Sequence, residues 1–190
     1  MAKAQYDRND IIDKAIDLFW RNGYSGSSMQ QVVKATGLKP GSLYYSFGNK
    51  EALFKEALER YAQQRIATIR QILDTAPNVG EGICKNFERV LHEARQSDYK
   101  SCLLVKTQLE LASEGNALHE FAAAKLREVE AVFQHYLERE FDTTRSQYRA
   151  TSIMLHIFGI RVYGYQCDAV DRIRQGLREG LPWLPWPQEE

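Results

Sequence analysis

Apolar residues recur along most of this 190-residue chain at intervals of three and four positions, which places them on one face of an α-helix. Near the N-terminus, Ile11, Ala15 and Phe19 follow this spacing, and charged residues occupy the opposite side. No stretch shows the sustained alternation that is typical of a β-strand, and no internal repeat is present. The pattern predicts an all-α protein.

Glycine and small polar residues indicate where the first helices begin and end. Asn9 or Asp10 can cap the first helix, which is expected to end at Gly23. Ser27 or Ser28 can cap the second in the same way, through a side-chain oxygen that accepts from a free backbone N–H. Two helices are therefore expected before residue 37.

A sharp turn at Gly37 should separate these helices from the next two. The third helix is predicted over residues 40–47, because Pro40 suits a first helical position, where no N–H is needed. Asn49 can cap a long fourth helix, whose apolar stripe runs to Pro77. A short helix, a glycine turn and a second short helix form the arrangement by which a helix-turn-helix enters the major groove of DNA.

The remainder is predicted to be a helical body. Residues 74–80 combine proline, glycine and small polar residues and are the best candidate for a boundary within the chain. Beyond them, apolar residues at helical spacing predict five further helices, the last two at about 146–167 and 168–180.

Composition and charge narrow the class of protein. A hydrophobic content of 44% is enough for the core of one or two small domains. The formal net charge is zero, but residues 1–50 hold seven Lys and Arg against four Asp, so this part carries +3 and the rest −3. A basic head on an acidic body suits a protein that touches phosphate at one end.

Neither a membrane nor a metal is expected as a partner. No segment approaches the ~20 apolar residues that span a bilayer, and the first residues lack the apolar core of a signal peptide, so we expect a cytoplasmic protein. Cys84, Cys102 and Cys167 show neither a disulfide framework nor metal-ligand spacing. The histidines lie on different predicted helices, so no cofactor is expected; they are His92, His119, His135 and His156.

The third predicted helix has an unusual outer face. Leu43 and Phe47 are four positions apart and should face the interior, which leaves Gly41, Ser42, Tyr44, Tyr45 and Ser46 outside. Hydroxyls and aromatic rings can bond phosphate oxygens, stack on sugars and meet thymine methyl groups. Gly41 would let the helix N-terminus approach the DNA backbone closely. The outer face therefore favours a DNA reader over a structural helix.

Residues 11–58, which include the run Leu43-Tyr44-Tyr45-Ser46-Phe47, resemble the N-terminal domain of TetR-type transcriptional repressors. The resemblance implies a three-helix DNA-binding domain over residues 1–48, completed by the start of the fourth helix to about residue 58, and a ligand-binding and dimerisation domain over 49–190. One departure is Val33, where the family usually keeps a small alanine. With Gly41 and Ser42 from the outer face, the expected DNA contacts are Ser28, Gln30, Lys39, Gly41, Ser42, Tyr44, Tyr45 and Lys50.

The resemblance also implies what the body does. Two copies would pair through their last two helices and place two heads on a palindromic double-stranded operator. A small molecule, which the sequence does not name, would bind inside the body and release the DNA. Aromatic residues with a few polar tips are candidates to line its pocket, although residues of this kind are equally typical of a plain core: Phe87, Leu91, Leu104, Gln108, Phe121, Tyr136, Phe158 and Tyr163.

Cys102 supports an alternative form of control. It is expected at the N-terminus of a helix, with Lys100 and Lys106 close in sequence, and helix amides and nearby cations make a thiol more reactive. Some TetR-like repressors that sense electrophiles and oxidants resemble this stretch. The alternative hypothesis is a thiol-based repressor of the same fold, whereas a small buried core cysteine is the simpler interpretation.

Two other classes fit less well. An all-helical enzyme would need a recognisable catalytic motif, and no Gly-rich phosphate loop, Gly-x-Ser-x-Gly or His-Glu-x-x-His is present, so we expect no enzyme. A helical scaffold would not account for two outward tyrosines between Lys39 and Lys50. The sequence favours a DNA-binding regulator.

Overall fold

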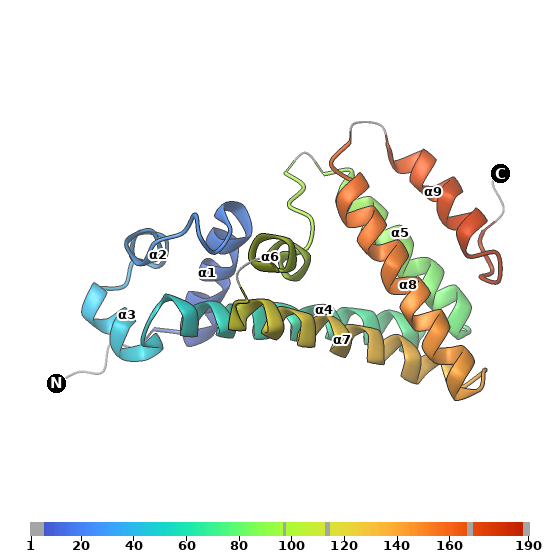
Figure 1. Ribbon diagram of the computed structural model, residues 1–190, viewed down its shortest axis with the longest axis horizontal. Helices are drawn as coiled ribbons and strands as arrows, with labels where there is room; N and C mark the ends of the chain where they lie inside the picture. Colours follow the sequence, from blue (N-terminus) through green and yellow to red (C-terminus); the bar gives the residue numbers. More distant parts are fainter. Residues whose placement is uncertain (1–5, 97, 113–114, 167–168, 188–190) are drawn as a thin grey trace. The chain divides into compact units, whose positions relative to one another are not determined.

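A computed structural model describes residues 6–96, 98–112, 115–166 and 169–187 of the chain (Figure 1). Within these ranges every regular element is an α-helix, which confirms the predicted all-α class. The helices are α1 (Arg8–Asn22), α2 (Met29–Thr36), α3 (Pro40–Phe47), α4 (Lys50–Thr75), α5 (Val79–Ala94), α6 (Leu103–Leu111), α7 (Ala117–Leu137), α8 (Thr143–Tyr163) and α9 (Ala169–Gly180). The first five residues and Cys167 lie outside the described residues.

Local sequence signals set most of the ends of α1, α2 and α3. Ser28 caps α2 in a reciprocal capping box, in which its hydroxyl accepts from the backbone of Gln31 and the Gln31 side chain accepts from the backbone of Ser28. Gly37 follows in the left-handed conformation, with φ +73°. The predicted cap of α1 was wrong: Asp7 fills this position instead of Asn9 or Asp10, because α1 begins earlier, at Arg8.

The chain divides into two compact units. Unit 1 comprises residues 1–63 and 102–126, and unit 2 comprises residues 64–101 and 127–190. This division differs from the expected one at residues 48 and 49, because side chains of α6 and α7 belong to the same hydrophobic core as α1–α4. Those buried residues are Leu103, Leu104, Leu111, Leu118 and Ala122.

Aromatic contacts hold the centre of unit 1. Phe19 of α1 meets Phe54 of α4 edge to face, with ring centroids 4.7 Å apart, and both rings are fully buried. Trp20 packs in the same way on Tyr61, at 5.2 Å. Val33, the departure noted in the sequence, is half-buried against this core, so the larger side chain is accommodated in the packing.

Unit 2 is built mainly from α5, α8 and α9, which pack on one another. Arg174 of α9 makes a two-point ion pair with Glu88 of α5, with distances of 2.9 and 2.8 Å, and lowers the pKa of that carboxyl group. After α9 the chain folds back, so that Leu184 is buried and the Trp186 ring lies 5.7 Å from Phe87. Among the described residues no helix is both long and apolar enough to cross a bilayer.

Candidate nucleic-acid interface

The recognition helix predicted over residues 40–47 is α3, and its bounds are the predicted ones. Leu43 and Phe47 are buried beneath it, as their spacing indicated. Tyr44 is 50% exposed and Tyr45 is 94% exposed. Two adjacent tyrosines with this much exposed surface contribute little to the packing of the core. Their rings and hydroxyl groups are therefore available to contact a partner.

All eight predicted DNA contacts lie in unit 1, on α2, on α3, at the residues that precede these helices, and at the first residue of α4. These helices are labelled in Figure 1. Six of the eight residues are exposed: Ser28, Gln30, Lys39, Gly41, Tyr44 and Tyr45. Ser42 and Lys50 are half-buried. The structure therefore groups the predicted contacts on one unit and leaves most of them open to solvent.

Gly41 is not required by the packing of the protein. A Cβ atom built at this position would meet no heavy atom within 4 Å, and its φ angle is not in the left-handed region. By contrast, Gly37 and Gly48 have φ angles of +73° and +75°, which only glycine adopts without strain. Since neither packing nor backbone conformation requires glycine at position 41, the missing side chain favours close approach of a binding partner to this helix.

Lys50 has a structural role that the sequence did not indicate. Its ammonium group donates to the backbone carbonyls of Tyr24 and Ser27, both at 3.0 Å, and lies 4.1 Å from the centre of the Tyr24 ring. These contacts fasten the start of α4 to the segment before α2. The predicted phosphate contact of Lys50 stays a prediction, and any such contact would share an ammonium group that already holds two carbonyls.

Arg8 fixes the C-terminal end of α3. It donates to the backbone carbonyl of Ser46 (3.1 Å), forms a two-point ion pair with Glu56 and lies 4.3 Å from the centre of the Phe47 ring. The hydroxyls of Tyr6 and Ser46 also share a hydrogen bond. Ser46, expected on the outer face, is thus held by the protein itself. No sequence signal pointed to these contacts of Arg8 within the protein, because Ser46 and Glu56 lie 38 and 48 residues away.

Helix α6 holds the connection between α1 and α2. The Glu110 carboxylate accepts from the backbone N–H groups of Tyr24 (3.0 Å) and Ser25 (2.7 Å), and a Cβ atom at Gly23 would collide with it. Lys106, one turn earlier, donates to the carbonyl of Trp20 at 2.5 Å. The sequence indicated neither contact, since Lys106 was noted only as a cation near Cys102. The contacts show that α6 supports the helix-turn-helix directly.

Comparisons with known proteins agree with this geometry. Residues 11–57 match the model of the bacterial regulatory proteins of the tetR family. A cysteine mutant of the TetR family transcriptional regulator CifR, solved in complex with 26-bp double-strand operator DNA, superposes with a TM-score of 0.80 over 98% of this chain and all of that one, at 25% identity. The chain belongs to the TetR family of DNA-binding transcriptional regulators.

Two curated HTH-type transcriptional regulators match different shares of the chain. The transcriptional repressor ComR of Escherichia coli K12 is 48% identical over 56 residues, which is 30% of this chain and 27% of ComR. The chain thus spans about a quarter of ComR, in a short high-identity segment. The uncharacterised regulator YezE of Bacillus subtilis 168 is 26% identical over 139 residues, which cover 73% of this chain and 72% of YezE.

The residues predicted to line a ligand pocket are divided between the units of this TetR family member. Leu104, Gln108 and Phe121 belong to unit 1, and the other five belong to unit 2. In unit 2, Phe87 packs on Trp186, Tyr136 donates to Asp74 at 2.6 Å and Tyr163 is 51% exposed. Neither unit brings all eight together, and the predicted pocket stays a prediction.

The cysteines differ in their surroundings. Cys102 stands at the N-cap of α6, as predicted, and is half-buried against the core of unit 1. Cys84 is buried, and burial together with the nearby Glu88 and Glu81 raises the pKa of its thiol to about 11. Cys84 is therefore a protonated core residue at neutral pH. Within the described ranges, no three His, Cys, Asp or Glu side chains are grouped to hold a metal ion.

Proposed function

We propose that this TetR family protein is a cytoplasmic, homodimeric repressor that leaves a palindromic operator when a small molecule binds. The observation that carries the proposal is the exposed pair Tyr44 and Tyr45 on α3, beside a glycine that the fold does not need. The short segment in which the chain is most similar to the repressor ComR lends further support to the sign of regulation.

Pairing through α8 and α9 is supported by apolar side chains on the surface of unit 2. Tyr148, Leu155 and Val162 follow one another at intervals of seven positions on α8. Their exposed fractions are 70%, 64% and 53%, respectively. Beside them lies a groove between α8 and α9 of about 440 Å³, whose lining includes Leu155, Gly159 and Ile173. A second copy of the same face would cover these side chains, and its two-fold symmetry would match a palindrome.

An effector that binds more tightly to the DNA-free state of the dimer lowers its affinity for the operator. By linkage, operator DNA lowers the affinity for the effector by the same factor. The predicted lining residues are the candidates for its site in the body.

The proposal is tested by selecting bound sequences from a random duplex library with the full chain. The expected result is a palindromic consensus bound by two chains. The variant Tyr45→Ala should lose at least tenfold in affinity for the selected duplex, and Leu109→Ala, which removes a 71% exposed side chain of α6, serves as the control. A library that yields no enriched sequence, or a consensus bound equally well by Tyr45→Ala, would count against it.

A thiol-controlled repressor of the same fold is the second candidate. It is supported by the position of Cys102, half-buried at the start of the helix that carries Lys106 and Glu110 to the head. The CifR structure to which this chain is similar carries substitutions of its cysteines, which draws attention to cysteine in a similar regulator. Treatment with an alkylating electrophile should then release operator DNA from the wild type and from Cys84→Ser, and leave Cys102→Ser bound. Release of Cys102→Ser at the wild-type rate would remove this candidate.

A further inference from the structure

The connection between α1 and α2 is held by two opposite charges from helices outside it. Glu110 of α6 accepts from the backbone N–H groups of Tyr24 and Ser25, at 3.0 and 2.7 Å. Lys50, the first residue of α4, donates to the backbone carbonyls of Tyr24 and Ser27, both at 3.0 Å. All of these residues belong to unit 1.

A single peptide group meets both charges. The peptide between Tyr24 and Ser25 donates through the N–H of Ser25 to Glu110, and it accepts through the carbonyl of Tyr24 from Lys50. The N–H and C=O of a trans peptide point in opposite directions, so the carboxylate and the ammonium group hold this peptide from opposite sides. Hydrogen bonds to charged groups are stronger than neutral ones, and bonds in a chain polarise one another. The orientation of the peptide therefore depends on both side chains together.

The Glu110 carboxylate also lies directly against the backbone that precedes this peptide. A Cβ atom at Gly23 would lie 2.6 Å from a carboxylate oxygen of Glu110, and Gly23 has a φ angle of +76°. Ser27, which is buried, donates from its hydroxyl to the carbonyl of Gly23 at 2.6 Å. These contacts leave the chain little freedom, so a displacement of Glu110 is expected to move the whole connection.

The connection ends where a DNA-facing part of the chain begins. Ser28 directly follows Ser27 and caps α2, and both Ser28 and Gln30 are exposed. Side chains that read bases must be held within about 0.5 Å of their working positions, whereas attraction between cations and phosphates acts over about 10 Å. A shift of α2 should therefore weaken binding to a preferred sequence and spare binding that does not depend on sequence.

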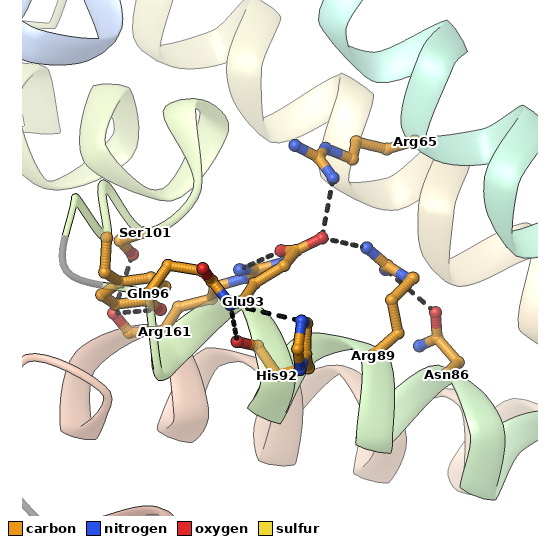
Figure 2. A network of polar contacts seen from close by, with 9 residues as sticks. Arg65, Asn86, Arg89, His92, Glu93, Gln96, Ser101 and Arg161 are labelled. Carbon is orange, nitrogen blue, oxygen red and sulfur yellow. Dashed lines mark hydrogen bonds and ion pairs between the residues drawn. The ribbon is translucent and has the colours of Figure 1, made fainter.

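A carboxylate of unit 2 makes contacts of a different kind (Figure 2). Glu93 of α5 accepts from the side chains of Arg161 and Arg65, at 2.8 and 3.1 Å, and from the side chain of Arg89. These contacts join side chains of α4, α5 and α8. Glu110 instead accepts from backbone N–H groups just before α2, and so fixes the path of the chain.

We propose that Glu110 is a positioning residue for DNA recognition, which acts through the peptide between Tyr24 and Ser25 and shares this task with Lys50. The role requires no contact between Glu110 and DNA. It rests on the DNA-reading function proposed for α2 and α3. Glu110 then determines how well a preferred sequence is distinguished from other duplexes.

The test compares the affinities of the full chain for its selected duplex and for a random duplex of the same length, at a temperature at which circular dichroism shows each variant folded. Glu110→Gln, which removes the charge and one acceptor oxygen, should lose roughly tenfold or more on the selected duplex, the equivalent of one base contact. On the random duplex it should bind as tightly as wild type or more tightly, because a negative charge is gone. Glu120→Gln, at a 76% exposed carboxylate of the same unit, should leave both affinities unchanged.

Two further variants separate positioning from charge and from stability. Glu110→Asp keeps the charge but shortens the side chain, so a positioning role predicts weaker binding to the selected duplex alone, whereas a role of charge alone predicts wild-type affinity. Glu93→Gln should destabilise unit 2 and leave the ratio of the two affinities unchanged. Equal falls of this ratio in Glu93→Gln and Glu110→Gln would show an effect of stability alone and would overturn the proposal.

A double-variant cycle tests the shared peptide. If Glu110 and Lys50 act on the same peptide, the loss on the selected duplex in Glu110→Gln/Lys50→Met should be at least about threefold smaller than the product of the two single losses. Lys55→Met, at a surface pair of α4, replaces Lys50→Met in the control cycle, where the effects should multiply. Effects that also multiply for Lys50 would overturn the shared peptide.

The remaining outcomes distinguish this role from the proposed function. A selected duplex bound equally well by wild type, Glu110→Gln and Glu110→Asp would overturn the positioning role and leave the repressor standing. Equal losses on the selected and the random duplex would also overturn it. A chain that enriches no duplex from the library would overturn both.

Discussion

The carboxylate of Glu110 accepts a 2.7 Å hydrogen bond from the backbone N–H of Ser25, a residue 85 positions earlier in the chain. The adjacent N–H of Tyr24 donates to the same carboxylate at 3.0 Å. These contacts place a side chain of α6 at the connection that sets where α2 begins. Helix α6, which is distant in sequence from α2 and α3, therefore helps to hold the helix-turn-helix in place.

Replacing this carboxylate should weaken the fold of unit 1. Glu110→Ala leaves two backbone N–H groups without their acceptor, which is expected to lower the free energy of unfolding by about 1–3 kcal/mol. Urea denaturation measures the change. Glu120→Ala, at an exposed carboxylate in the first turn of α7, should stay within about 0.5 kcal/mol of wild type. Equal effects of the two variants would contradict the supporting role of Glu110.

Gly41→Ala should separate DNA binding from stability. The added methyl group meets no atom of the protein within 4 Å, and alanine is favoured over glycine in a helix by up to about 1 kcal/mol. The melting temperature is expected to stay the same or rise, while affinity for the selected duplex falls several-fold. The matched variant Gly37→Ala, at φ +73°, should instead lower the melting temperature. Full DNA affinity in Gly41→Ala would show that no backbone approaches there.

Lys50→Met tests the tie between α4 and the start of α2. Loss of the ammonium group leaves the Tyr24 and Ser27 carbonyls without this donor, and we expect the free energy of unfolding to fall by about 1–2 kcal/mol. Lys55→Met removes only a surface pair with Glu51 and is the control. Unchanged stability with weakened DNA binding would instead assign Lys50 to a direct phosphate contact.

Glu93 predicts a specific dependence of stability on pH. Its pKa is lowered in the folded chain, so its ionised form stabilises the fold above the ordinary value of about 4.3, and this contribution is lost as the pH falls through the folded value. The difference in unfolding free energy between wild type and Glu93→Gln should therefore be greatest near neutral pH and shrink in acid. Urea denaturation at about pH 7 and below pH 4 measures it, with Glu138→Gln on the surface as the control. A difference that does not change with pH would contradict the ion cluster.

The sequence was most informative where structure is set by near neighbours. The bounds of α3, a serine cap on α2 and a turn at Gly37 depend on residues within four positions, and each was predicted. The structure decides between Ser27 and Ser28 in favour of Ser28, and gives Gly37 the left-handed conformation. The exposed faces of Tyr44 and Tyr45 followed from the burial of Leu43 and Phe47 by the same helical spacing.

Contacts between distant segments could not be read in this way. Glu110, Lys106 and Arg8 are ordinary charged residues of amphipathic helices, and only the fold brings them to their partners. Arg161 lies in a helix whose apolar spacing gave no sign that a buried cation belonged there. For the same reason, the sequence assigned α6 to the body, although its leucines complete the core of unit 1.

The measurement that bears most directly on the central claim is the salt dependence of binding to the selected duplex, compared between wild type and Lys39→Ala. If the exposed face of α2 and α3 reads DNA, the logarithm of affinity should fall linearly with the logarithm of salt concentration. Loss of one phosphate contact in Lys39→Ala should then reduce that slope by about one for each chain bound. An affinity that does not change with salt concentration, or the same slope for wild type and Lys39→Ala, would contradict the assigned interface.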